Sequence, residues 1–95
     1  MLYKVSEYTS QTGRIYIQSE DLVGTGRNWT EGASILGIEI SDFLSKIKRE
    51  YSAELTPYRR DGELIYVGFY WTDLAKARKY KNYINRCARE KSYQI

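Results

Sequence analysis

The sequence contains no histidine, and Cys87 is its only cysteine. Without histidine the chain lacks the side chain that most often serves as a general base and as a zinc ligand. A single cysteine cannot form an internal disulfide, which argues against a small secreted scaffold. Cys87 falls on an apolar stripe, where a cysteine usually acts as a small buried hydrophobe. We therefore expect no enzyme activity, no metal site and no cofactor.

Long apolar runs are also missing. No stretch approaches the roughly 20 residues that a membrane-spanning helix needs. The first residues lack the basic segment and apolar run of a secretory signal. Hydrophobic residues make up 42% of the chain and charged residues 28%, which is typical of a globular protein. With one proline and no low-complexity tract, we expect residues 1–95 to form one cytoplasmic domain that does not bind membranes.

Alternating polar and apolar residues predict two hairpins. The first pairs strands at residues 2–9 and 14–18 across a turn at 10–13. The second pairs strands at 53–60 and 63–71 across Asp61-Gly62, a sequence suited to a type I′ turn. Pro57 cannot donate to a ladder, so the strand that holds it is an edge strand or carries a bulge. The last strand is expected to turn one face inward, formed by Ile65, Val67, Phe69 and Trp71.

Apolar residues at three- and four-residue steps predict helices at 29–36, 42–51 and 73–91. Gly37 suits the left-handed position after the first helix, and Ser41 and Thr72 are expected to cap the other two. The predicted fold class is α+β: a four-stranded, mostly antiparallel sheet in ββα(α)ββα order with the helices packed on one face. The order of the strands in the sheet stays open.

The last predicted helix has an apolar stripe and a basic face opposite to it. The stripe consists of Leu74, Ala77, Tyr80, Ile84, Cys87 and Ala88. The opposite face holds Arg78, Lys79, Asn82, Asn85, Arg86 and Arg89. Residues 53–95 carry nine basic and five acidic side chains, whereas residues 1–52 carry six and seven. The cations are expected to contact phosphates, and the asparagines to reach base edges in a major groove. The alternative is an ordinary solvated helix face.

Tyrosine is abundant, with ten in the chain. On their strands Tyr16, Tyr66 and Tyr70 lie opposite the clearest apolar stripes, and Arg14 shares their face. If the helices cover the other face, these four side chains stand on an open sheet surface. Such a surface is suited to stacking unpaired bases or to binding a partner protein. Cross-strand stabilisation of the sheet explains the same residues without a ligand.

Two shorter motifs each have a functional and a purely structural interpretation. The stretch 33–43, with Ala33, Gly37 and flanking apolar residues, is similar to the pattern of a helix-turn-helix. A generic tight corner between two helices explains it equally, and Asp42 near the start of the second helix would repel phosphates. Residues 24–28 hold two glycines and Arg27 and are able to bind an anion, although most such segments are plain loops.

Together these features predict a non-enzymatic binding module. The preferred interpretation is a nucleic-acid-binding, regulatory protein that acts through the basic last helix. The alternative is a protein-interaction module, such as a small regulator or inhibitor encoded by a phage or mobile element, that uses the tyrosine-rich sheet face. Association into a homodimer is compatible with either. Because the two surfaces point in opposite directions, one nucleic-acid strand is not expected to use both.

Overall fold

The chain forms an α+β fold in the order ββααββα, as predicted. The computed structural model describes residues 3–19 and 28–92. Its elements are β1 (Val5–Thr9), β2 (Ile15–Ser19), α1 (Asn28–Leu36), α2 (Ile40–Tyr51), β3 (Glu54–Arg60), β4 (Glu63–Tyr70) and α3 (Leu74–Glu90). The loop at 24–28 lies outside the described residues except for its last residue, which begins α1. Among the described helices, none combines the length and the apolarity that crossing a membrane requires.

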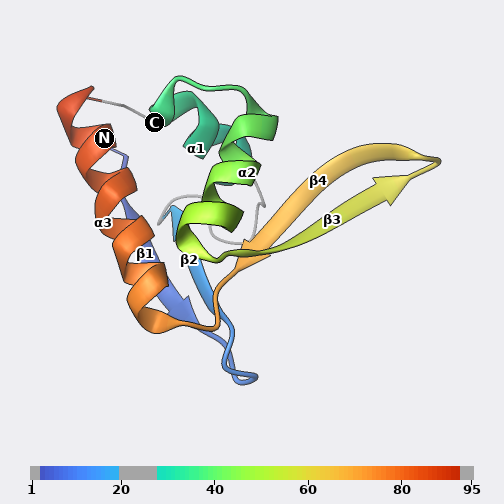
Figure 1. Ribbon diagram of the computed structural model, residues 1–95, viewed down its shortest axis with the longest axis horizontal. Coiled ribbons are helices and arrows are strands. Elements are labelled where there is room, and N and C mark those ends of the chain that lie inside the picture. Colours follow the sequence, from blue (N-terminus) through green and yellow to red (C-terminus); the bar gives the residue numbers. More distant parts are fainter. Residues whose placement is uncertain (1–2, 20–27, 93–95) are drawn as a thin grey trace.

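The four strands form two antiparallel hairpins, β1–β2 and β3–β4. One isolated antiparallel bridge joins them: the backbone N–H groups of Ile15 and Trp71 each donate to the other residue's carbonyl oxygen at 2.7 Å. The four predicted strands are present, but they form two hairpins joined by one bridge and not one continuous sheet. Two-stranded ribbons twist strongly, and after this single pair the β3–β4 hairpin leaves the body as a projecting arm (Figure 1).

Helix α3 packs against β1 and β2, α2 contacts β3, and α1 packs against both other helices; the described helices leave the opposite side of the strands uncovered (Figure 1). Trp71 lies at the centre of the core and is fully buried. Its indole N–H donates to the carbonyl oxygen of Tyr51 at 2.8 Å, and its ring stacks on Tyr80 at 5.0 Å between centroids. Complete burial raises the pKa of Tyr80 well above its ordinary value. Trp71 thus ties the two hairpins to the end of α2 and to α3.

A close corner joins α1 and α2. Gly37 adopts a positive φ of 67°, and the N–H of Ile38 donates to the carbonyl oxygen of Ala33 at 3.1 Å, as in a Schellman motif. The helices approach most tightly at Gly32, where an added Cβ would lie 2.4 Å from the Cζ of Phe43. The helix-turn-helix-like stretch therefore forms a helical corner with a tight contact at Gly32, and Ala33 next to it is buried in the core.

Several local predictions need correction. The N-cap of α2 is Glu39 and not Ser41, and it makes no side-chain capping bond. Asp73 caps α3 in place of Thr72, because its carboxylate accepts the N–H of Lys76 at 3.2 Å. Two residues expected in the core are exposed: Leu74 (40%) and Ile65 (51%). Ile65 lies on the projecting arm, where a bulge shifts the pairing of β3 and β4.

Candidate functional site

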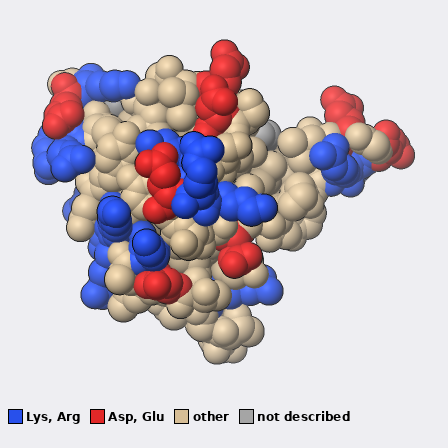
Figure 2. Space-filling view, viewed as in Figure 1, with Lys and Arg blue, Asp and Glu red and all other residues tan. Residues whose placement is uncertain are grey.

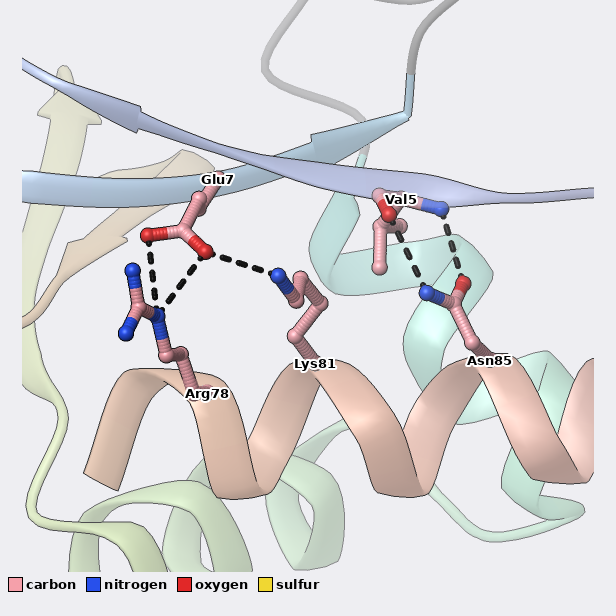
Figure 3. Close-up of polar contacts among 5 residues, drawn as sticks. All are labelled: Val5, Glu7, Arg78, Lys81 and Asn85. Carbon is pink, nitrogen blue, oxygen red and sulfur yellow. Dashed lines mark hydrogen bonds and ion pairs between the residues drawn. The ribbon is translucent and has the colours of Figure 1, made fainter. Parts of the chain in front are cut away.

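The helix α3 is fastened to the outer edge of β1 by an asparagine. The Asn85 carboxamide accepts the backbone N–H of Val5 at 2.9 Å and donates to the Val5 carbonyl oxygen at 3.1 Å (Figure 3). The side chain thus occupies both hydrogen-bonding groups of an edge-strand residue, as a neighbouring strand would. While it binds Val5, Asn85 cannot reach the base edges that the sequence suggested for it.

Glu7 ties a second part of α3 to β1. Its carboxylate accepts the Lys81 ammonium at 2.7 Å and the Arg78 Nε at 3.1 Å (Figure 3). The hydrogen bond from Lys81, followed by that from Arg78, lowers the pKa of Glu7 below its ordinary value of 4.5. Arg78 therefore faces β1 and has a carboxylate partner. The basic face of α3 is consequently divided, and Arg78 does not lie with the other predicted cations.

The flank of α3 that faces α2 forms an open pocket. It measures about 270 Å³, and its lining residues are Tyr51, Lys79, Asn82, Tyr83 and Arg86. Four of the five come from α3, at positions that share one side of a helix, and Tyr51 is the last residue of α2. We call this site the α2–α3 pocket. It brings together three of the predicted residues, Lys79, Asn82 and Arg86.

Three cations surround the paired tyrosine rings of the pocket. The rings of Tyr51 and Tyr83 stack at 5.9 Å between centroids, with an interplanar angle of 22°. The Arg86 guanidinium and the Lys46 ammonium lie 5.7 and 5.6 Å from the Tyr83 ring centre. The Lys79 ammonium lies 6.0 Å from the ring centre of Tyr51. Such contacts stabilise by about 0.5–1 kcal/mol at exposed sites and hold the charges near the rings.

Among the described residues, Glu50 alone offsets this positive charge by an ion pair. Its carboxylate lies 2.9 Å from the Lys46 ammonium, and that hydrogen bond lowers the pKa of Glu50 and raises that of Lys46. Lys79 and Arg86 form no ion pair within the described part of the chain. Three cations and one carboxylate leave a net charge of about +2 at pH 7. Lys and Arg side chains also predominate over the α2 and α3 surface in Figure 2.

The two tyrosine hydroxyls at the pocket remain neutral at pH 7. Burial is the largest influence on each and raises the pKa of both Tyr51 and Tyr83. Asn82 is exposed, and its carboxamide has no hydrogen-bond partner among the described residues. The pocket thus offers cations and neutral polar groups in one concave site. This is the chemistry that recognises a phosphate.

Some residues of this site escaped the sequence reasoning. Tyr51 and Tyr83, which line the pocket, and Lys46, which lies beside it, were not predicted to take part. Tyr83 follows Lys79 by four residues and precedes Arg86 by three, a spacing that places all three on one helix face. This spacing could have been read from the sequence. The contribution of α2 depends on tertiary packing, so it could not have been read from the sequence. The remaining predicted cation, Arg89, is exposed near the end of α3 and does not line the pocket.

The second candidate surface spans both hairpins, on the side without helices. We call it the tyrosine face, and its residues are Tyr8, Arg14, Tyr16, Tyr58, Tyr66 and Tyr70. The ring centroids of Tyr16 and Tyr70 are 6.1 Å apart, and the Arg14 guanidinium carbon lies 4.4 Å from the Tyr70 ring centroid. The prediction that Arg14, Tyr16 and Tyr70 share a surface agrees with this geometry. Burial raises the pKa of Tyr66, with smaller effects from Tyr58 and Tyr16.

Cross-strand pairing adds two tyrosines that the sequence reasoning missed. Tyr8 pairs with Tyr16, and Tyr58 pairs with Tyr66, with the latter rings stacked at 4.7 Å and 17°. Plain counting from the Asp61-Gly62 turn would place Tyr58 opposite Ile65. The bulge between Tyr58 and Arg59 moves the partner to Tyr66.

Comparison with known proteins adds no assignment: no family model, curated protein or solved structure gives a significant match to the chain. Within residues 3–19 and 28–92, no group of three or more acidic, cysteine or histidine side chains is arranged to hold a metal ion. The chemistry of the site therefore has to be argued from its own geometry.

Proposed function

We propose that the protein is a nucleic-acid-binding module that contacts phosphates through the α2–α3 pocket. The observation that carries this proposal is the convergence of Lys79, Asn82 and Arg86 on one concave site. The cations Lys79 and Arg86 have no carboxylate partner among the described residues, so phosphate binding does not require the loss of an existing ion pair. The role is one of binding and regulation and not of catalysis.

The geometry favours this pocket over the whole face of α3. Arg78 and Lys81 are held by Glu7, and Asn85 is held by Val5. A ligand that used the β1 flank of the helix would have to break these contacts. The α2 flank has unpaired cations already positioned by the tyrosine rings. Preorganised charges bind an anion with less loss of side-chain freedom, because their rotamers are already restricted.

Binding of fluorescently labelled oligonucleotides, measured by anisotropy at about 50 and about 200 mM salt, tests the proposal. A site that contacts the nucleic acid through two or three cations should lose roughly tenfold or more in affinity over this range, because each contact releases counterions. Comparison of single and double strands identifies the preferred form. Absence of binding at the lower salt would remove the nucleic-acid function altogether.

A second function is favoured by a different observation. The projecting arm exposes three large apolar side chains, Tyr58 (50%), Leu64 (37%) and Ile65 (51%), and the tyrosine face continues from it to Tyr8 (61%). Exposed aromatic side chains anchor protein interfaces. A protein-interaction role predicts that Tyr58→Ala and Tyr66→Ala abolish partner binding and leave oligonucleotide affinity unchanged. Sedimentation over a range of concentrations would show whether that partner is a second copy of the chain.

A further inference from the structure

The α2–α3 pocket differs from an extended phosphate-binding stripe in the way its charges are arranged. Lys46, Lys79 and Arg86 all lie within 6.0 Å of the ring centre of one of two stacked tyrosines. A protein that follows a nucleic-acid backbone distributes its cations along the strand, one for each phosphate. Here Lys79 and Arg86 line one pocket, and Lys46 lies beside it, near the Tyr83 ring. The ligand group should therefore concentrate its negative charge in the same way.

The charge balance of the site narrows the choice of ligand group further. The three cations and Glu50 leave about +2, and the carboxylate of Glu50 stays ionised because the hydrogen bond from Lys46 lowers its pKa. An internal phosphodiester carries one negative charge, whereas a phosphate monoester carries about −1.5 to −2 at pH 7. The monoester also presents three terminal oxygens. Those oxygens are suited to receive bonds from the ammonium groups, the guanidinium and the Asn82 carboxamide.

We propose that the α2–α3 pocket binds the terminal phosphate monoester of a nucleic-acid strand. This inference rests on the proposed function, since it names the part of the nucleic acid that the same pocket takes. The open pocket of about 270 Å³ is lined by one side of α3 and by the last residue of α2, and it receives a strand end more readily than the middle of a duplex. Arg86 and Lys79 hold the phosphate from α3, and Asn82 donates a neutral hydrogen bond.

The test compares labelled oligonucleotides of one sequence that carry a phosphate at one end, at the other end, or at neither. One of the two phosphorylated strands should bind about tenfold more tightly than the strand without a phosphate, because charge-assisted hydrogen bonds to the added dianion contribute in that range. Arg86→Gln should remove this preference. Arg78→Gln should keep it, because Arg78 is paired with Glu7 on the other flank. Thermal melting of each variant confirms that it is folded.

The absence of histidine makes pH a second readout. Between about pH 5.5 and about pH 7, Lys46 keeps its charge, Tyr51 and Tyr83 stay neutral, and Glu50 stays ionised, because the pKa of Glu50 is lowered and the other three pKa values are raised. The phosphate monoester loses its second proton in this interval. The preference for a phosphorylated end should therefore grow as the pH rises. A preference that does not change with pH would contradict recognition of the dianion.

The outcomes separate the two proposals. Equal affinity for all three strands would overturn the terminal phosphate and leave the nucleic-acid function standing. If no strand binds, both fail. Inorganic phosphate and a nucleoside monophosphate serve as competitors, since they share the same chemistry. If either binds as tightly as the phosphorylated strand, the pocket is a site for small phosphate compounds, and the assignment to a strand end is wrong.

Discussion

Asn85 binds both backbone groups of Val5, eighty positions away in the sequence, through hydrogen bonds of 2.9 and 3.1 Å. One side chain thereby closes part of the free edge of β1 and fixes the distance of α3 from the first hairpin. Because α3 carries most of the α2–α3 pocket, this bond also contributes to the position of the pocket. An unpaired sheet edge attracts further strands, so the contact protects the protein from edge-to-edge association as well.

Replacement of Asn85 by alanine should reduce the free energy of unfolding by about 1–3 kcal/mol, because it leaves a backbone N–H and a carbonyl without partners. Asn85→Asp keeps the acceptor and loses the donor, so its loss of unfolding free energy should lie between those of wild type and Asn85→Ala. Urea unfolding measures both. The matched control is Asn82→Ala on the same helix, which removes an exposed carboxamide without a partner and should change stability by less than about 0.5 kcal/mol. Equal effects at the two positions would contradict the role assigned to Asn85.

Glu7 should make stability depend on pH. Its pKa in the folded protein is lower than the ordinary value of 4.5, so its contribution is present above about pH 4.5 and is lost as the pH falls through the lowered value. Wild type should therefore be more stable than Glu7→Gln at pH 7, and the difference should shrink as the pH falls below about 4.5. Raised salt should reduce it as well. Glu63→Gln, at the tip of the arm, is the control, because Glu63 forms no ion pair among the described residues.

Gly32 should not tolerate a larger residue. An alanine Cβ would lie 2.4 Å from the Cζ of Phe43, which is fully buried. Overpacking of this kind typically costs about 1–3 kcal/mol, more than the roughly 1 kcal/mol gained when alanine replaces glycine in a helix. Thermal or urea unfolding of Gly32→Ala should therefore show a net loss. Phe43→Leu should restore part of it in the double variant. Exposed Ser34→Ala on the same helix should be neutral or slightly stabilising.

The sequence predicted where the helices and strands lie along the chain better than it predicted which elements pack against one another. The Asp61-Gly62 turn and the periodicity of α3 follow from local chemistry, so the second hairpin and the last helix lie where expected. Periodicity shows which residues of a helix share a face, but not which element flanks that face. For this reason Arg78 and Arg86 looked equivalent, although one meets Glu7 and the other meets Tyr83. The position of Lys46 beside the Tyr83 ring arises from the packing of α2 beside α3.

The same limit applies to the tyrosine face. Alternation along the strands placed Tyr16 and Tyr70 on one surface, and the structure confirms that their rings are near each other. The partner of Tyr58 depends on a bulge between Tyr58 and Arg59. Pro57 indicated an edge strand or a bulge, but it did not specify where the register would shift. The register of a hairpin is set by turn geometry together with packing, and a single inserted residue changes every pair beyond it.

The stacked pair of Tyr58 and Tyr66 should contribute little to stability. Cross-strand aromatic pairs typically add about 0.2–1 kcal/mol, and Tyr58 is half exposed on a projecting arm. Tyr58→Ala should therefore lower the free energy of unfolding by less than about 1 kcal/mol. Chemical denaturation checks this, with Tyr8→Ala as the comparison. A loss of several kcal/mol would show that the tyrosines serve the fold, and it would weaken the argument for an interface on this face.

Nucleic-acid binding through the α2–α3 pocket is tested most directly by the oligonucleotide affinity of Arg86→Gln beside that of Arg78→Gln. Both changes remove one positive charge from the same helix, Arg86 on the α2 flank and Arg78 on the β1 flank, so the net charge of the protein changes equally. Arg86→Gln should weaken binding about tenfold and lower the slope of log affinity against log salt by about one, since one phosphate contact is lost. Arg78→Gln should leave affinity within about twofold. Equal losses in both variants, or no loss in either, would contradict a phosphate site in the pocket.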